Sequence, residues 1–271
     1  MCFLIKYHSH QNYGVFFLKF TTFNIRGAWY ADEQNALIHR IGMIFKKLDD
    51  ENPDVVCFQE MTESIRDFFN AHFHGHTIIG TGREEGYTGE MMAIMINNAT
   101  VELLGFDTFW LSDEPYTPGS RFDCQSEYPR ICTVAFLKEK ATGKVFRVYN
   151  VHLDIFEDAA YLGVQKVLAR LSDDMKKSEM PFIMAGDFNV APSSETIKRC
   201  YANTDPVMVD HTKKLTLTRH GFMNRGEMKK IDYVFTDENT AKTVSEPDVW
   251  DDKLDGIWLS DHFPISVTLS L

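Results

Sequence analysis

Cysteine is scarce in this chain, which has five among its 271 residues: Cys2, Cys57, Cys124, Cys132 and Cys200. The count is odd, and no two cysteines have the short C-x-x-C spacing of a zinc or redox site. These absences argue against a disulfide framework and against a zinc ribbon. Free thiols in a reducing cytoplasm are the simplest interpretation.

Positive charge is also in short supply. Lysine and arginine total 28 against 39 aspartates and glutamates, a formal net charge of −11. This balance argues against an extended positively charged surface that binds nucleic acid, so a nucleic-acid substrate would need a bound metal or a local basic patch. No apolar run approaches the ~18 residues of a membrane span, and the start lacks a signal-peptide cleavage site. We expect a cytoplasmic protein with no membrane span, and the sequence indicates no obligate protein partner.

Short apolar runs and amphipathic stretches alternate along the chain. The strands predicted from them lie at 17–25, 54–58, 91–96, 101–109, 131–139, 144–153, 181–186, 231–235 and 263–271. The predicted helices lie at 33–48, 62–73 and 162–175, and a long loop is expected over 110–129. Because the periodic pattern begins near Phe17, we expect a loosely ordered leader over 1–17 and a single domain over 18–271.

The two halves of the chain are alike. Each has a strand, a helix, a proline and a buried strand. Polar residues follow these strands, Asn24 and Glu60 in the first half and His152 and Asp187 in the second. Because such strand ends meet at one edge of an α/β sheet, where ligands usually bind, these side chains are expected to converge. Two halves facing each other predict an α/β sandwich of two mixed sheets with helices outside.

Eight residues at or beside strand ends are candidates for the chemistry: Asn24, Glu60, His152, Asp187, Asn189, Asp232, Asp261 and His262. Four of them are carboxylates, which favours a hard cation such as Mg²⁺ or Mn²⁺ over zinc. No serine or cysteine stands in a nucleophile elbow. This donor set suits attack of water on phosphorus, with a carboxylate orienting the water and an imidazolium stabilising the transition state.

Each candidate also has an ordinary interpretation on its own. Asn24 suits a turn, Glu60 suits a helix cap, and His152 suits a partly buried structural histidine. Only the ordered set outweighs these alternatives.

Three further residues are weaker candidates for substrate binding. Arg83 and Arg130 can hold a phosphate oxygen but are typical of solvated loops. Trp110 can stack on a substrate ring or tuck into the core edge.

Six strings carry a resemblance to a known family: TTFNIRG, VVCFQE, NVHLD, GDFNVAP, KIDYVF and LSDHFPI. In this order and at these spacings they resemble the endonuclease/exonuclease/phosphatase superfamily, which includes deoxyribonuclease I-like enzymes. The resemblance covers about 18–271, and its nearest broader likeness is to poly(A)-exonucleases. It implies a four-layer α/β/β/α sandwich with outer helices and one metal-dependent site.

The resemblance also implies roles. Glu60 would be the principal ligand of Mg²⁺ or Mn²⁺, helped by Asn24. Asp261 would contact the metal directly or through one of its ligands. Asp187 would orient or deprotonate the attacking water, beside Asn189.

The remaining roles concern the scissile phosphate. His152 and His262 would contact it, and Asp232 would hold the His262 ring. Glu90 falls where some relatives place the acid partner of the first histidine, here His152.

One position departs from the pattern, because Arg26 stands where exonuclease III-type repair enzymes have an acid. Abasic-site cleavage is therefore in doubt. The expectation is a phosphoester hydrolase, with a 3'–5' exonuclease acting on a single-stranded nucleic-acid end preferred. The alternatives are a phosphatase or phosphodiesterase of a small molecule or lipid head group, and a non-catalytic binding module on the same fold.

Overall fold

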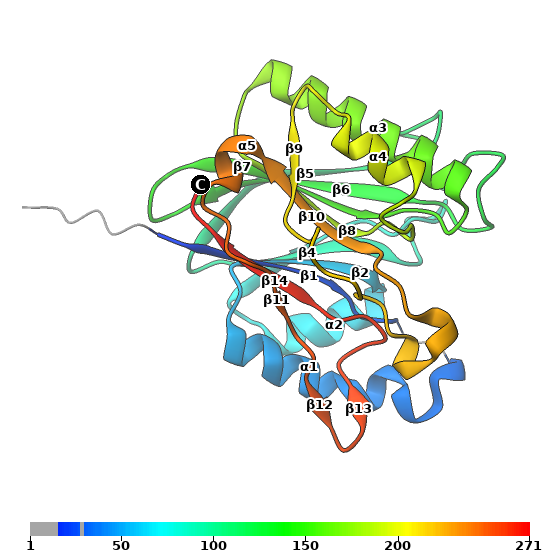
Figure 1. Cartoon of the computed structure of the whole chain (residues 1–271). Helices are drawn as coiled ribbons and strands as arrows, with labels where there is room; N and C mark the ends of the chain where they lie inside the picture. The colour runs from blue at the N-terminus through cyan, green and yellow to red at the C-terminus, as the bar shows by residue number, and fades with distance from the viewer. Residues whose placement is uncertain (1–15, 28–29) are drawn as a thin grey trace, which may run out of the picture.

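The computed structural model describes residues 16–27 and 30–271 (Figure 1). The leader expected over 1–17 lies outside this range except for its last two residues. The strands are β1 (Leu18–Asn24), β2 (Val55–Met61), β3 (His76–Ile79), β4 (Met91–Asn97), β5 (Val101–Trp110), β6 (Ile131–Glu139), β7 (Val145–His152), β8 (Phe182–Asp187), β9 (Met208–Asp210), β10 (Asp232–Asp237), β11 (Asp248–Val249), β12 (Lys253–Leu254), β13 (Ile257–Trp258) and β14 (Ile265–Leu269). The α-helices are α1 (Leu37–Glu51), α2 (Glu63–His72), α3 (Glu157–Lys177), α4 (Glu195–Tyr201) and α5 (Glu238–Ala241), and short 3₁₀ segments cover Tyr30–Asn35, Gly221–Met223 and Arg225–Glu227.

Two six-stranded sheets stack face to face, and helices cover their outer faces (Figure 1). The first sheet has the order β11-β14-β1-β2-β4-β3, and the second has the order β5-β6-β7-β8-β10-β9. Helices α1 and α2 lie outside the first sheet, and α3 and α4 lie outside the second. The predicted four-layer α/β/β/α sandwich is therefore confirmed. No helix among the described residues is both long and apolar enough to cross a membrane.

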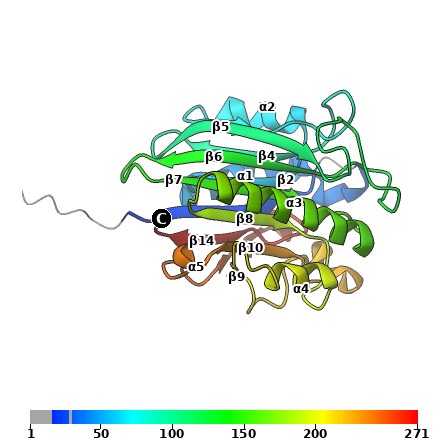
Figure 2. The same ribbon diagram turned by 90° about the horizontal axis from the view of Figure 1, so that it is seen from above.

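A parallel strand pair lies inside each sheet, as the likeness between the two halves predicts. Strands β1 and β2 pair in parallel around α1, and β7 and β8 pair in parallel around α3. Figure 2 shows α3 lying over the strands of the second sheet. Within these pairs Asn24 is level with Gln59, and His152 is level with Asp187. The polar residues therefore emerge together at the carboxyl edges of the parallel strands.

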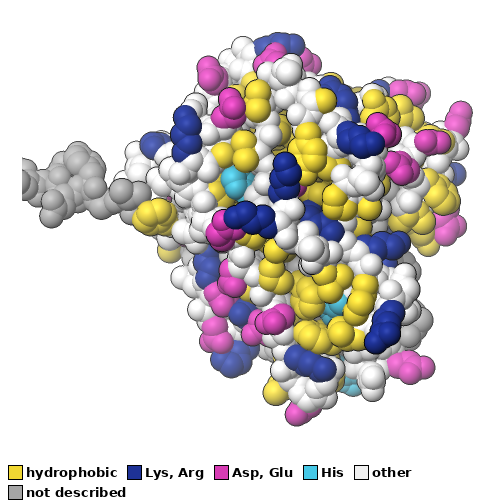
Figure 3. All heavy atoms as spheres, viewed as in Figure 1, with side chains coloured by type: hydrophobic (Ala, Val, Ile, Leu, Met, Phe, Trp, Pro, Cys, Tyr) yellow, Lys and Arg dark blue, Asp and Glu magenta, His cyan; other side chains and the backbone are white. Residues whose placement is uncertain are grey.

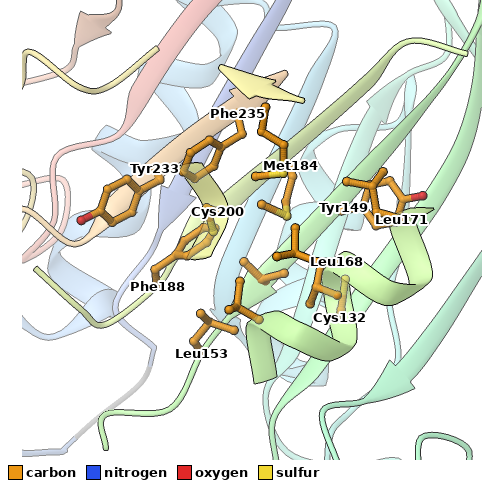
Figure 4. Close-up of a cluster of buried hydrophobic side chains, with 14 of the residues drawn as sticks. Cys132, Tyr149, Leu153, Leu168, Leu171, Met184, Phe188, Cys200, Tyr233 and Phe235 are labelled. Carbon is orange, nitrogen blue, oxygen red and sulfur yellow. The ribbon is translucent and has the colours of Figure 1, made fainter. Parts of the chain in front are cut away.

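Both faces of the central strands are buried, which explains their nearly continuous apolar sequences. In β8, Phe182 and Met184 face α3 and α4, whereas Ile183 and Ala185 pack between the two sheets. Figure 4 shows the cluster under α3 and α4, where Phe188, Tyr233 and Phe235 gather around Met184 and Cys200. This packing on two sides fixes the strand ends that carry the polar residues.

Some element boundaries differ from the sequence-based expectation. The helix predicted from residue 33 begins at Leu37, because Glu33 has a φ of 44° and interrupts a 3₁₀ segment. It continues past the predicted end at residue 48 to Glu51, where Asn52 takes the left-handed conformation before Pro53 and terminates it. Strands β4 and β5 are consecutive, but they belong to different sheets. The half-exposed edge strand β3 was not predicted, because its sequence does not alternate clearly.

Candidate active site

A cavity of ≈ 510 Å³ opens beside the carboxyl ends of the parallel strands. Nine of the twelve candidate residues line this catalytic cavity: Glu60, Arg83, Glu90, Arg130, His152, Asp187, Asn189, Asp261 and His262. The other three, Asn24, Asp232 and Trp110, do not line it. Their hydrogen bonds place each of them directly behind a lining residue.

Asn24 connects the two halves of the site. Its amide Nδ2 donates to Glu60 Oε1 at 3.1 Å and to Asp187 Oδ2 at 3.1 Å. Its Oδ1 accepts the backbone N–H of Arg26 at 3.0 Å, which fixes the orientation of the amide. Asn24 therefore holds a carboxylate from each sheet in one place.

The segment after β1 is shaped around Glu60. The backbone N–H of Gly27 donates to Glu60 Oε2 at 3.0 Å, and a Cβ at Gly27 would lie 2.9 Å from the Glu60 carbonyl oxygen. Glu60 itself has a φ of 61°, a strained value for a side-chain-bearing residue. The buried Arg40 side chain donates to the Ile25 carbonyl at 2.8 Å and to the Leu259 carbonyl at 2.7 Å. These contacts join the end of β1 to the segment that carries Asp261 and His262.

Asp187 lies at the buried end of β8. Its Oδ1 accepts the backbone N–H of Asn189 at 2.8 Å, which is possible because Asn189 turns back with a φ of 55°. The Asn189 side chain in turn donates to the Leu153 carbonyl at 2.9 Å. Burial and then the neighbouring Asp232 raise the pKa of Asp187. A carboxylate with a raised pKa is a suitable acceptor for a proton from water near neutral pH.

His262 is buried and carries a charge. Its Nδ1 lies 2.9 Å from Asp232 Oδ2, and Asp232 also accepts the hydroxyl of Thr218. Burial alone would lower the pKa of His262, but Asp232, Asp261 and Asp187 together raise it to about 10. The ring is therefore an imidazolium at neutral pH, and Nε2, 3.7 Å from Asp187 Oδ2, is a hydrogen donor in the cavity.

His152 has the opposite electrostatic character. Burial first, and then the guanidinium groups of Arg130 and Arg83, lower its pKa well below the usual value. Its Nε2 lies 3.6 Å from Asp187 Oδ2, and its buried Nδ1 has no hydrogen-bond partner among the described residues. The expectation that Glu90 is its acid partner is therefore wrong for this chain. Glu90 Oε2 instead lies 2.7 Å from the Arg83 guanidinium.

Trp110 is a second correction. Its ring is 3% exposed, and the indole N–H donates to the Arg83 carbonyl oxygen at 2.6 Å. A buried indole in this position cannot stack on a substrate, so Trp110 supports the backbone of Arg83 instead. The accessible aromatic side chains at the wall of the cavity are Phe156 and Tyr128, and the Tyr128 ring lies 4.7 Å from the Arg83 guanidinium.

Other residues of the site were not predicted to act there. Asp154, in the string NVHLD, accepts from Arg130 Nε at 3.2 Å and from the Ser126 backbone N–H at 3.2 Å. It thereby fastens the 111–130 loop to the end of β7. Arg26 and Arg219 also line the cavity. Arg26 follows Asn24 by two residues, and Arg219 precedes the KIDYVF strand. Arginines on loops are usually solvated, so these positions alone do not predict a role in the site.

The donor set suits a hard divalent cation. Glu60, Glu90, Asp187 and Asp261 line one cavity, and burial and then Glu60 raise the pKa of Glu90. A divalent cation would relieve this repulsion between carboxylates. Asp187, Asp232 and His262 also offer ligand atoms within 4.8 Å of one another. However, the charged His262 ring is already paired with Asp232 and would repel a cation. Glu60 is therefore the better candidate for the principal ligand.

Comparisons with known proteins agree with this arrangement. The chain matches the Endonuclease/Exonuclease/phosphatase family over residues 21–262. An endonuclease/exonuclease/phosphatase from Bacteroides vulgatus has 28% identity and a TM-score of 0.87, covering 94% of this chain and 99% of that one. A mannosyl-6-phosphatase from Bacteroides thetaiotaomicron has 25% identity and a TM-score of 0.82, covering 94% and 100%. An uncharacterized protein of Acanthamoeba polyphaga mimivirus has 24% identity over 84% of this chain and 90% of its own length.

The matched segment contains every candidate residue from Asn24 to His262 and most of both sheets. The chain therefore belongs to the endonuclease/exonuclease/phosphatase family, whose members are phosphoester hydrolases that generally depend on a divalent metal.

Proposed function

We propose that this chain is a metal-dependent phosphomonoesterase that releases phosphate from a small phosphorylated molecule. The observation that carries the proposal is the set of four arginines lining the same cavity as Asp187 and His262: Arg26, Arg83, Arg130 and Arg219. Each is held by a carboxylate, that of Asp32, Glu90, Asp154 and Glu227 respectively, and a guanidinium has further N–H groups that can donate to a phosphate. A terminal phosphate carries up to two negative charges and three free oxygens. Guanidinium groups satisfy these oxygens better than any other side chain.

The shape of the cavity also supports a small substrate. Its volume of ≈ 510 Å³ falls within the range of about 300–1,000 Å³ that is typical of small-molecule sites. Ser126, Glu127 and Tyr128 of the 111–130 loop form part of its wall. Acidic and basic side chains are interspersed over the face drawn in Figure 3. The formal net charge of −11 does not favour a strand of nucleic acid.

The chain's own groups divide the chemistry between them. Asp187, held by Asn189 and Asn24, accepts a proton as the oxygen of water bonds to phosphorus. His262, charged through Asp232, donates to a phosphoryl oxygen, and the arginines balance the remaining negative charge. Glu60 and Asp261 would hold the cation, which supplies Lewis-acid polarisation of the phosphoryl group. The bond from phosphorus to the leaving oxygen then breaks, and that oxygen takes a proton from solvent.

The similarity to a mannosyl-6-phosphatase supports a monoester substrate. The sequence-based preference for a single-stranded nucleic-acid end stays a prediction, and one substrate panel tests both. The panel contains p-nitrophenyl phosphate, hexose phosphates, bis-p-nitrophenyl phosphate, oligo(A), single- and double-stranded DNA, a phosphoinositide and sphingomyelin.

With Mg²⁺ or Mn²⁺ present, we expect monoesters to exceed diesters by about a hundredfold or more in kcat/KM. Asp187→Ala serves as the inactive reference. Shortening of oligonucleotides without release of phosphate from any monoester would refute the proposal. Absence of turnover on every substrate would favour the non-catalytic binding module.

A further inference from the structure

A second cavity, of ≈ 270 Å³, adjoins the catalytic one. The two cavities share four lining residues, Glu60, Arg83, Glu90 and Tyr128. We call the smaller one the annex. It is also lined by Thr62, just before α2, and by Glu84. Because both cavities use the same wall, a substrate with its phosphate in the catalytic cavity has the annex beside it.

The charge of the annex disfavours a second phosphate. Three carboxylates line it, those of Glu60, Glu84 and Glu90, against the single guanidinium of Arg83. That guanidinium is already engaged by Glu90 at 2.7 Å and lies 3.5 Å from Glu84. A polyphosphate or the next phosphodiester of a nucleic acid would therefore meet net negative charge here.

The remaining features of the annex suit hydroxyl groups. Carboxylates accept hydrogen bonds from hydroxyls, and the Thr62 hydroxyl, which contacts Ser64 Oγ at 3.1 Å but makes no cap hydrogen bond to α2, can both donate and accept. Tyr128 is 37% exposed and provides an apolar ring surface. One face of that ring is covered by the Arg83 guanidinium at 4.7 Å, so an organic cation would be repelled from it.

The hydrogen bonding of Arg83, which lines both cavities, provides a second observation in favour of a ligand here. Arg83 is only 4% exposed, and its Nε makes no hydrogen bond among the described residues, because the Glu84 Oε1 with which it pairs lies 3.5 Å away. Buried donors are rarely left unpaired, and an ordered water or a ligand oxygen normally completes them. The Nε of Arg83, a residue that lines both cavities, can therefore donate to a ligand oxygen.

We propose that the annex binds the leaving group of the substrate, and that this group is an uncharged polyol such as a monosaccharide. The proposal rests on the phosphomonoesterase activity proposed above and identifies its substrate class. Glu84 and Thr62 determine specificity by hydrogen-bonding the hydroxyls, and Tyr128 packs against the carbon skeleton.

The test compares kcat and KM for hexose 6-phosphates, phosphocholine and p-nitrophenyl phosphate in four variants. Glu84→Gln and Thr62→Val alter the annex. Glu85→Gln and Thr77→Val are matched controls, because these residues line neither cavity.

We expect Glu84→Gln and Thr62→Val each to lower kcat/KM for hexose phosphate about tenfold relative to p-nitrophenyl phosphate, mainly through KM. The two controls should leave that ratio unchanged. Thermal unfolding of each variant verifies that it is folded.

Three results would overturn the annex proposal while leaving the phosphomonoesterase intact. The first is an equal loss of kcat/KM on hexose phosphate and on p-nitrophenyl phosphate in the annex variants. The second is a wild-type preference for phosphocholine over hexose phosphates. The third is hydrolysis of p-nitrophenyl phosphate by wild type without hydrolysis of any hexose phosphate. Turnover of diesters alone would instead remove the proposed function, and the annex proposal with it.

Discussion

Replacing Asp232 with asparagine should remove the charge of His262 while leaving the ring near its place. The Asp232 carboxylate lies 2.9 Å from His262 Nδ1, and both side chains are buried. At about 3 Å and an effective dielectric constant of about 20, a unit charge contributes about 5–6 kcal/mol. That energy corresponds to roughly four pH units. The pKa of His262, about 10 in the native chain, should fall to about 6 in Asp232→Asn.

The consequence is a pH-dependent loss of activity. A histidine whose pKa is raised keeps its charge below that pKa and loses it as the pH rises through it. In the native chain His262 therefore stays charged until the pH approaches 10. In Asp232→Asn about half of it would be charged at about pH 6 and about one part in a hundred at about pH 8. Relative to wild type, kcat/KM should fall about twofold at the lower pH and about a hundredfold at the higher one.

The assay is phosphate release from p-nitrophenyl phosphate across this pH range, with the variant expressed as a ratio to wild type. The ratio removes the titration of groups that both proteins share, except that of Asp187, whose pKa Asp232 itself raises. Asp174→Asn is the matched control, because Asp174 is a buried carboxylate that accepts from Tyr149 and lies outside the cavity. A ratio that stays constant with pH would refute the reasoning about the charge of His262.

Three further substitutions test other parts of the site. Asp187→Ala should lower turnover by about three orders of magnitude with a near-native melting temperature; a mild rate effect would remove Asp187 from the mechanism. Gly27→Ala should reduce metal-dependent activity and destabilise the fold by about 1–3 kcal/mol, because the added Cβ would lie 2.9 Å from the Glu60 carbonyl oxygen. If this variant kept the activity of the wild type, Glu60 would tolerate displacement. Asn150, buried between the sheets, donates to the Phe58 and Ala93 carbonyls at 2.8 Å each. Asn150→Leu should cost about 2–4 kcal/mol and lower the melting temperature by roughly 5–10 °C, and a shift below about 2 °C would contradict this role.

The sequence predicted the architecture well where packing dominates. Strands β1, β2, β7 and β8 are buried on both faces, so their apolar runs are unambiguous and their polar ends are visible. The order of strands within each sheet could not be obtained this way, because antiparallel neighbours such as β14 come from distant parts of the chain.

The cavity residues at and beside the ends of β2 and β8 were predicted, whereas roles that depend on a contact with Arg83 were missed. Glu60 and Asp187 reach the cavity from the ends of β2 and β8, and His262 reaches it from the segment between β13 and β14. Trp110 and Glu90 illustrate the limit, since the partner of each is Arg83, whose position depends on how the loop folds. Local periodicity does not encode such contacts, so a buried indole and an ion-paired glutamate cannot be distinguished from substrate-binding residues in sequence.

The central claim is a metal-dependent phosphomonoester reaction organised by Glu60. Its most direct test is hydrolysis of p-nitrophenyl phosphate by wild type and Glu60→Gln, each stripped with EDTA and then titrated with Mg²⁺ or Mn²⁺. We predict that EDTA abolishes wild-type activity, that either ion restores it, and that Glu60→Gln needs a much higher metal concentration. Hydrolysis that is indifferent to EDTA, or a Glu60→Gln titration that overlays the wild-type curve, would contradict the claim.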